Sequence, residues 1–194
     1  MNNFEAIVIG VSAGGMNAIH KLISCLKVDL QVPVIIAQHL HPNQTEYFIE
    51  FFQKDTPIPV VSACDKTEVQ PGTIYFAPPD YHLLLDDKHT LSLAMDEKVN
   101  FSRPSIDLLF DSAAEVFGAN LIGILMTGAN NDGARGLKKI KHFGGLTIVQ
   151  SPESAEYSVM PQSAIDLFTP DHVLEIPEIA FFVNNLQEIN CSYD

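Results

Sequence analysis

The sequence predicts an α/β fold with a doubly wound, mostly parallel sheet in a Rossmann-like three-layer arrangement, plus one β-hairpin excursion. Strand-like apolar runs alternate with helix-like patterns along the 194 residues, which is typical of a parallel sheet covered by helices on both faces. The first apolar run, residues 6–9, passes directly into a glycine-rich turn and then into an amphipathic pattern. Such a strand–turn–helix unit is the usual start of an open α/β sheet.

The elements follow in order along the chain. Apolar runs predict strands at residues 6–9, 34–37, 59–63, 73–77, 121–126, 146–150 and 173–176. Helical spacing predicts helices at about 14–26, 43–54, 105–118, 132–143, 161–168 and 177–189. Two short apolar runs around a polar turn at residues 82–93 predict the hairpin. Pro104 lies near the first turn of the helix at 105–118, where proline is well tolerated.

Composition indicates one domain over residues 1–194, since 46% of the residues are hydrophobic and no linker or repeat divides the chain. No apolar run approaches the ~18 residues that cross a bilayer, and no basic signal-peptide start is present, so we expect a cytoplasmic protein without membrane insertion. Cys25, Cys64 and Cys191 lie outside any C-x-x-C spacing and are expected to be reduced thiols, buried or otherwise inert. A net charge of -13 argues against nucleic acid as a partner, because nucleic acid requires a basic surface.

Three polar residues follow three of the predicted strands. Ser12 lies between glycines after the first strand, His39 after the strand at 34–37, and Asp132 after the strand at 121–126. Carboxyl ends of parallel strands meet at one edge of the sheet. The arrangement predicts a catalytic triad in which Ser12 is the nucleophile, His39 the general base and Asp132 the acceptor of the imidazole N–H.

Each of these residues has a simpler interpretation. Ser12 would suit a phosphate-binding loop, His39 a hydrogen-bonded strand end, and Asp132 the N-cap of the helix that follows it. His39 and His41 would suit a metal ion, but no cysteine or carboxylate cluster completes the ligand set. We therefore expect no metal and no cofactor.

The order serine, histidine, aspartate separates this chain from other serine hydrolases. α/β-Hydrolases place the acid before the histidine and need several strands before the nucleophile, whereas only eleven residues precede Ser12. A patatin-like serine–aspartate dyad requires a glycine-rich oxyanion loop upstream of the serine, and none is present.

Six segments together resemble the catalytic domain of CheB-type chemotaxis protein-glutamate methylesterases. They are IGVSAGG at 9–15, QHLHP at 38–42, VQPGTIYFAPPDYH at 69–82, RPSIDLLFDSAA at 103–114, LMTGANNDGARGL at 125–137 and TIVQSPESAEYSVMPQSAI at 147–165. The resemblance implies cofactor-free hydrolysis of γ-glutamyl methyl esters on methyl-accepting chemotaxis receptors, with release of methanol and in many members deamidation of receptor glutamines. By position, the family's catalytic residues fall on Ser12, His39 and Asp132. We expect oxyanion or rim positions at Ala13, Ala129 and Met160, the first two through their amides.

Departures from the family pattern leave alternatives open. The chain starts at the first catalytic strand, so we expect no receiver domain and constitutive activity. Ala13, Ala129–Asn130 and His41 replace residues that are usual in the family, and they touch the rim of the site. A non-catalytic receptor-docking module and an esterase with a non-receptor substrate remain the alternative functions. His82 is expected to line the cleft or to make a structural hydrogen bond, and Arg103 to meet a receptor or to hold the preceding loop.

Overall fold

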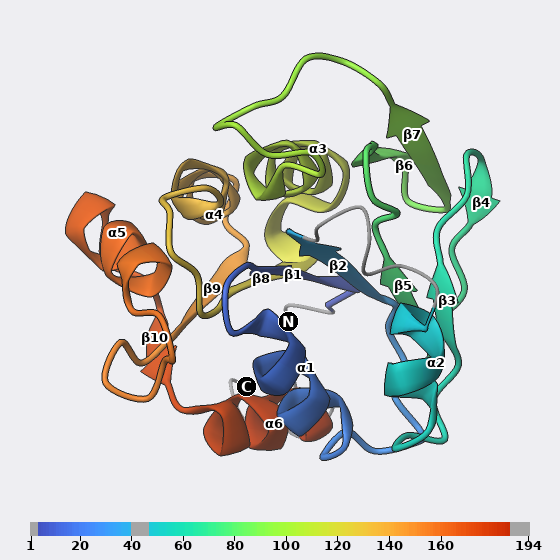
Figure 1. The fold of residues 1–194 in the computed structure, drawn as a ribbon, viewed down its shortest axis with the longest axis horizontal. Coiled ribbons are helices and arrows are strands. Elements are labelled where there is room, and N and C mark those ends of the chain that lie inside the picture. The colour runs from blue at the N-terminus through green and yellow to red at the C-terminus, as the bar shows by residue number, and fades with distance from the viewer. Residues whose placement is uncertain (1–3, 40–46, 187–194) are drawn as a thin grey trace.

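A seven-stranded parallel sheet forms the centre of the computed structural model, which describes residues 4–39 and 47–186 (Figure 1). Its strand order is β10-β9-β8-β1-β2-β5-β3. The strands are β1 (Ala6–Val11), β2 (Val34–Gln38), β3 (Val60–Ser62), β5 (Ile74–Phe76), β8 (Leu121–Leu125), β9 (Leu146–Gln150) and β10 (His172–Leu174). The chain begins in the middle of the sheet, extends it to one side, and returns to extend it to the other. This confirms the predicted doubly wound α/β fold.

Helices cover both faces of the sheet. In Figure 1, α3 (Ile106–Phe117), α4 (Ala134–His142) and α5 (Val159–Leu167) lie above it, and α1 (Gly15–Ile23), α2 (Phe48–Gln53) and α6 (Ile176–Asn184) lie below it. Side chains alternate between the two faces of a strand, and both faces of β1 are apolar. Ile7 and Ile9 join the core with α1 and α6, whereas Ala6 and Val8 join the core with α3 and α4. Two hydrophobic cores therefore hold β1 between them.

The hairpin excursion is present and has one more strand than expected. β6 (His82–Asp87) and β7 (Thr90–Ala94) pair in antiparallel fashion, and β4 (Thr67–Glu68) adds to β7 to give a three-stranded sheet. A strand of two residues is too short to show a period in the sequence. Leu83 and Leu85 of β6 pack with the side chains of α3, so the excursion covers one side of that helix.

Some boundaries differ from the expectations. α5 begins at Val159, two residues early, and a short 3₁₀ helix, Gly118–Asn120, follows α3. Residues 43–46 and 187–189 of two predicted helices lie outside the described residues. Cys25 and Cys64 are free, as expected for reduced thiols, but they are exposed and not buried. Cys191 lies outside the described residues.

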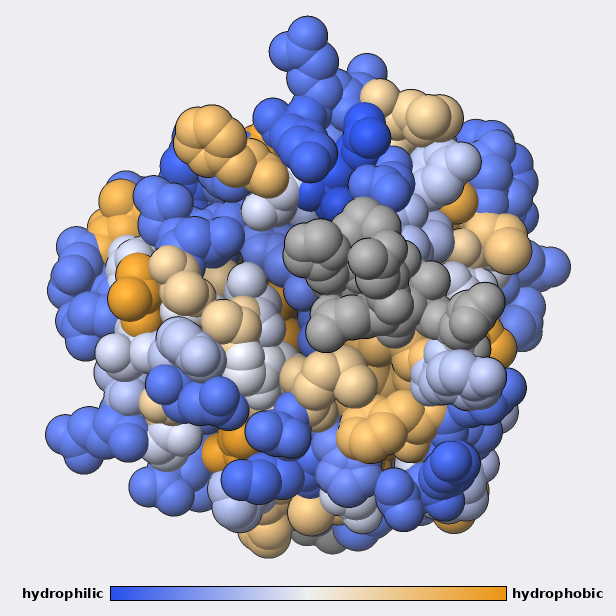
Figure 2. All heavy atoms as spheres, viewed as in Figure 1, coloured by the Kyte–Doolittle hydropathy of each residue, from blue (hydrophilic) through white to orange (hydrophobic). Residues whose placement is uncertain are grey.

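The face seen in Figure 2 is mostly hydrophilic, with apolar side chains gathered in small groups, one of them in the region of α1 and α2. In the described ranges, no helix is both long and apolar enough to cross a membrane.

Candidate active site

The three candidate catalytic residues lie on three neighbouring strands. β1 pairs with β8 on one side and with β2 on the other. Ser12 directly follows β1, His39 directly follows β2, and Asp132 lies in the loop between β8 and α4. Because these strands are parallel, their carboxyl ends present the three side chains at one edge of the sheet.

Hydrogen bonds join the three side chains into one chain. The Ser12 Oγ lies 3.0 Å from His39 Nδ1, and His39 Nε2 lies 2.9 Å from Asp132 Oδ2. The carboxylate only accepts, so Nε2 carries the proton and Nδ1 presents its lone pair to the Ser12 hydroxyl. The ring nitrogens are thus used in the order opposite to that of chymotrypsin, where Nε2 faces the serine. The His39 side chain is 14% exposed.

Asp132 is fully buried and accepts hydrogen bonds from the start of α3. The amide of Ile106 donates to Oδ2 at 2.7 Å, and the amide of Asp107 and the Ser105 hydroxyl donate to Oδ1 at 3.2 and 3.1 Å. A helix N-terminus is a favourable place for a negative charge. The simpler interpretation of Asp132 as the N-cap of α4 does not hold, because Gly133 occupies that position and no side chain caps the helix.

These contacts keep the Asp132 carboxylate ionised. Burial by itself raises the pKa of Asp132, but hydrogen bonds from His39, Asn100 and Ile106 together hold it below its ordinary value. An ionised carboxylate in this position can stabilise an imidazolium at His39.

The turn that carries Ser12 is held at both ends. The Ser12 amide donates to the Thr127 carbonyl at 3.0 Å, and the Gly15 amide donates to the Ser12 carbonyl at 2.8 Å. Gly14 has φ +76°, and a Cβ there would lie 3.0 Å from the Thr127 hydroxyl and from Glu156 Cβ. Glycine is therefore required by both backbone conformation and space.

Ala13 and Ala129 leave their amides available. In the part of the chain that the structure describes, neither amide donates to another protein group. The Thr127 hydroxyl donates to the Ala13 carbonyl at 2.9 Å, which ties the turn to the loop after β8. Met160 is fully buried and packs over Gly128, where a Cβ would meet the Met160 Cε at 2.6 Å. It lies beneath the rim and supports the segment that carries Ala129.

Asn130 contacts His39. Its Oδ1 accepts from the Asp132 amide at 3.1 Å, so its Nδ2 faces His39 Nδ1 at 3.4 Å. The sequence marks Asn130 as a departure from the family pattern, but the contact depends on side-chain orientation, which no spacing reveals.

Two further predicted positions have structural roles. His82 is buried, accepts from the Ser105 amide and donates to the Glu97 carbonyl. Arg103 donates to the carbonyls of Met95 and Asp96, so it holds the preceding loop. His41 lies outside the described residues, and within them no three histidine, cysteine, aspartate or glutamate side chains are placed to hold a metal.

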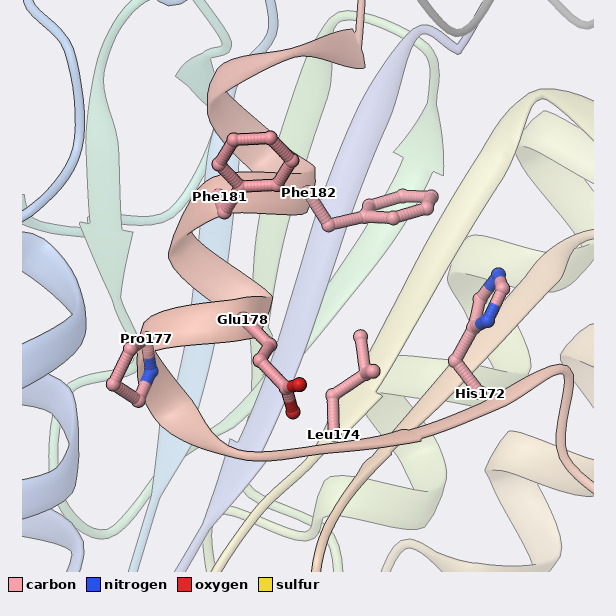
Figure 3. A pocket seen from close by; sticks show the side chains of 6 residues that line it. All are labelled: His172, Leu174, Pro177, Glu178, Phe181 and Phe182. Atoms are coloured by element: carbon pink, nitrogen blue, oxygen red, sulfur yellow. The ribbon is translucent and has the colours of Figure 1, made fainter.

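A separate pocket of about 380 Å³ lies at the far edge of the sheet, between β10 and α6 (Figure 3). It is lined by His172, Leu174, Pro177, Glu178, Phe181 and Phe182. Phe182 points toward His172, with ring centroids 5.3 Å apart, and the Glu178 carboxylate caps the start of α6 by accepting from the Glu175 amide. The pocket therefore presents no nucleophile with an activating base.

Comparisons with known proteins identify the family of this chain. Residues 7–183 match the family model for the CheB methylesterase. A Leptospira interrogans protein, named provisionally as a protein-glutamate methylesterase/protein-glutamine glutaminase, is 46% identical over 188 residues, 97% of each chain. The Thermotoga maritima protein-glutamate methylesterase/protein-glutamine glutaminase is 34% identical over 90% of this chain and 52% of its own length. The crystal structure of its CheB methylesterase catalytic domain superposes with a TM-score of 0.90 at 31% identity, covering 94% of this chain and 98% of that one.

Proposed function

This chain belongs to the CheB methylesterase family, and we propose that Ser12, His39 and Asp132 are the triad with which it hydrolyses methyl esters of protein glutamate side chains. One observation carries the assignment: an unbroken hydrogen-bonded chain runs from the Ser12 hydroxyl through both ring nitrogens of His39 to the buried Asp132 carboxylate.

The geometry supports acyl transfer. His39 Nδ1 takes the Ser12 proton as Oγ attacks the ester carbonyl, and Asp132 stabilises the resulting imidazolium. The developing oxyanion accepts from the amides of Ala13 and Ala129, which have no protein acceptor among the described residues. The imidazolium then gives its proton to the methoxide, and methanol leaves.

A water molecule completes the cycle. His39 takes a proton from water as the hydroxide attacks the acyl-enzyme, and collapse of the second tetrahedral intermediate returns the proton to Ser12 and frees the glutamate. A glutamine side chain would give the same acyl-enzyme with release of ammonia, which is why we propose both activities. The proposed partner is a methylated chemotaxis receptor.

The test is methanol release from a methylated chemotaxis receptor. Ser12→Ala should abolish release and leave the free energy of unfolding nearly unchanged, because the half-exposed hydroxyl bonds only to His39 among the described side chains. Ser24→Ala is the matched control, because its hydroxyl caps the exposed end of α1 and its removal should leave release intact. Retained turnover in Ser12→Ala would favour a site elsewhere. Absence of turnover by the unmodified protein would favour the docking module or, if a small methyl ester is hydrolysed, an esterase with another substrate.

A further inference from the structure

A second buried carboxylate lies beside the triad and is not used by the proposed reaction. Asp107 is 6% exposed, and its Oδ1 accepts from the Gly136 amide in the first turn of α4 at 2.7 Å. Asp132 makes the reciprocal contact with the first turn of α3 through the Ile106 amide. Asp107, in the first turn of α3, thus accepts from the first turn of α4. Asp132, which lies just before α4, accepts from the first turn of α3.

One amide group bridges the two carboxylates. Asn100 Nδ2 lies 3.0 Å from Asp107 Oδ2 and 3.0 Å from Asp132 Oδ1. An amide nitrogen has two hydrogens and no lone pair to offer, so both of its donors are used. Because both partners are acceptors, the side chain of Asn100 has only one satisfactory orientation, and Asp107 fixes it as much as Asp132 does.

The electrostatics of the pair favour such a bridge. Burial raises the pKa of Asp107, the Gly136 hydrogen bond opposes this, and the neighbouring charge of Asp132 raises it further. The pKa of Asp132, in contrast, is lowered. A neutral donor between two like charges favours the ionised form of Asp132 without adding a competing charge.

The backbone at Asn100 presents this amide inward. Val99 and Ser102 exchange two backbone hydrogen bonds, of 3.2 and 2.9 Å, around Asn100 and Phe101. Both central residues have positive φ, +51° and +62°, as in a type I′ turn, where asparagine is favoured at the first position. Phenylalanine is uncommon in this conformation, and Phe101 is 98% exposed. The turn therefore directs one side chain to the solvent and the other to the triad.

We propose that Asn100, oriented by Asp107, is a positioning residue that holds the Asp132 carboxylate in place to receive the His39 N–H. This inference rests on the proposed function, because it assigns a supporting pair to that same triad. Asn100 acts through Asp132, so it should affect the activation of Ser12 and not the binding of substrate.

Asn100→Gly tests the role of the amide apart from the turn, because glycine adopts the same positive φ. We expect kcat for a small methyl ester to fall roughly tenfold or more, the effect of losing a hydrogen bond to a charged group, with KM unchanged. The rate at which a fluorophosphonate probe modifies Ser12 should fall in parallel. Asn120→Gly is the matched control, because Asn120 Nδ2 also donates to a carboxylate, that of Glu5, at 3.0 Å, next to the opposite end of β1. In Asn120→Gly, both kcat and the rate of probe labelling should be unchanged.

A double-variant experiment with Asp132 distinguishes a positioning role of Asn100 from a general effect on stability. In an Asp132→Ala background, Asn100→Gly should cost no further activity, because the residue it acts through is gone. A purely structural role predicts that the two losses multiply, and that result would overturn the inference. Asp107→Asn preserves volume and an acceptor for Gly136 but places a second NH₂ group against Asn100, so it should also slow probe labelling. Labelling at the unmodified rate would contradict the role of Asp107.

The outcomes for the two proposals are distinguishable. If Ser12 of the unmodified protein does not react with the probe and no ester is hydrolysed, the proposed function fails. If the unmodified protein reacts and Asn100→Gly reacts as fast, only the positioning role is overturned.

Discussion

At the scale of single residues, the order of the ring nitrogens in His39 determines what each neighbour must do. In the proposed reaction, Nδ1 must keep its lone pair for the Ser12 proton, so the proton of the neutral ring must stay on Nε2. Asp132 Oδ2, at 2.9 Å from Nε2, enforces this because an ionised carboxylate only accepts hydrogen bonds. Replacing this acceptor by a donor should therefore reverse the tautomer.

Asp132→Asn makes that replacement with little change in volume. An amide NH₂ facing Nε2 would move the proton to Nδ1, which could then no longer act as a base, and we expect kcat to fall by about 10⁴, as found for the equivalent change in a serine protease. Asp171→Asn is the matched control, since Asp171 accepts from the Thr147 amide and hydroxyl beside the edge strand β10. Ester hydrolysis measured for both variants checks the prediction, and a loss below tenfold in Asp132→Asn would contradict the tautomer argument.

The sequence was sufficient to predict Ser12, His39 and Asp132 as partners, because each follows a strand and parallel strands align their ends. It was not sufficient for Asn100 or Asn130. Asn100 is 32 residues from Asp132 and reaches it from a turn whose inward direction depends on two positive φ values. Such contacts come from side-chain orientation, which has no period in the sequence.

At the scale of elements, two helices of the site start at left-handed glycines. Gly14 precedes α1 and Gly133 precedes α4. Gly133 has φ +88°, and a Cβ there would lie 2.5 Å from Ile106 Cγ2 and 2.6 Å from Leu125 Cδ1. The close approach is needed because it brings Asp132 against the first turn of α3.

Gly133→Ala should therefore destabilise the protein by about 2–5 kcal/mol, the sum of left-handed strain and overpacking, and should also lower activity. Gly144→Ala is the matched comparison. Gly144 has φ +84°, but a Cβ there would meet only Ala119, at 3.5 Å, so the cost should be about 1–2 kcal/mol from strain alone, with activity kept. Chemical denaturation measures both values, and equal losses would contradict the packing argument.

Asp171 connects α4, β9 and the start of β10, and it makes stability depend on pH. Burial raises the pKa of Asp171, but hydrogen bonds from Lys141 and Thr147 bring it below its ordinary value. A carboxylate whose pKa is lower in the folded than in the unfolded state stabilises the protein at pH values above the unfolded-state pKa of about 3.9. This contribution is lost as the pH falls through the folded-state pKa. Asp171→Asn should thus be less stable than the unmodified protein at pH 7, with a difference that shrinks below about pH 4. A difference independent of pH, in denaturation curves across this range, would contradict the assignment.

The boundaries of strands and helices show how far the spacing of apolar residues can predict structure. The seven strands of the main sheet were predicted because each is a compact apolar run between polar turns, as in β8, where all five residues are buried. β4 was missed, since Thr67 and Glu68 pair only with β7 and carry no apolar signal. α5 begins at Val159, directly after the segment in which the Tyr157 amide donates to the Thr127 hydroxyl. This is a tertiary contact that the sequence pattern does not reveal.

At the scale of the whole molecule, the site depends on the winding of the sheet. The chain leaves β1 toward β2 and later returns to β8 on the other side of β1, so three segments that lie far apart in the sequence end side by side. Alternating patterns predict this winding, and with it the shared edge. They do not predict that Asp107 in α3 accepts a hydrogen bond from the start of α4 while Asp132, before α4, accepts one from the start of α3. These contacts depend on how the two helices pack.

The proposed triad is tested most directly by identifying the residue that a fluorophosphonate probe modifies, by peptide mass mapping of the labelled protein. The proposed triad predicts one adduct per chain, located on Ser12, absent in Ser12→Ala and formed much more slowly in His39→Ala. An adduct on another serine, or labelling of Ser12 that is equally fast without His39, would contradict the assignment of Ser12, His39 and Asp132 as one catalytic unit.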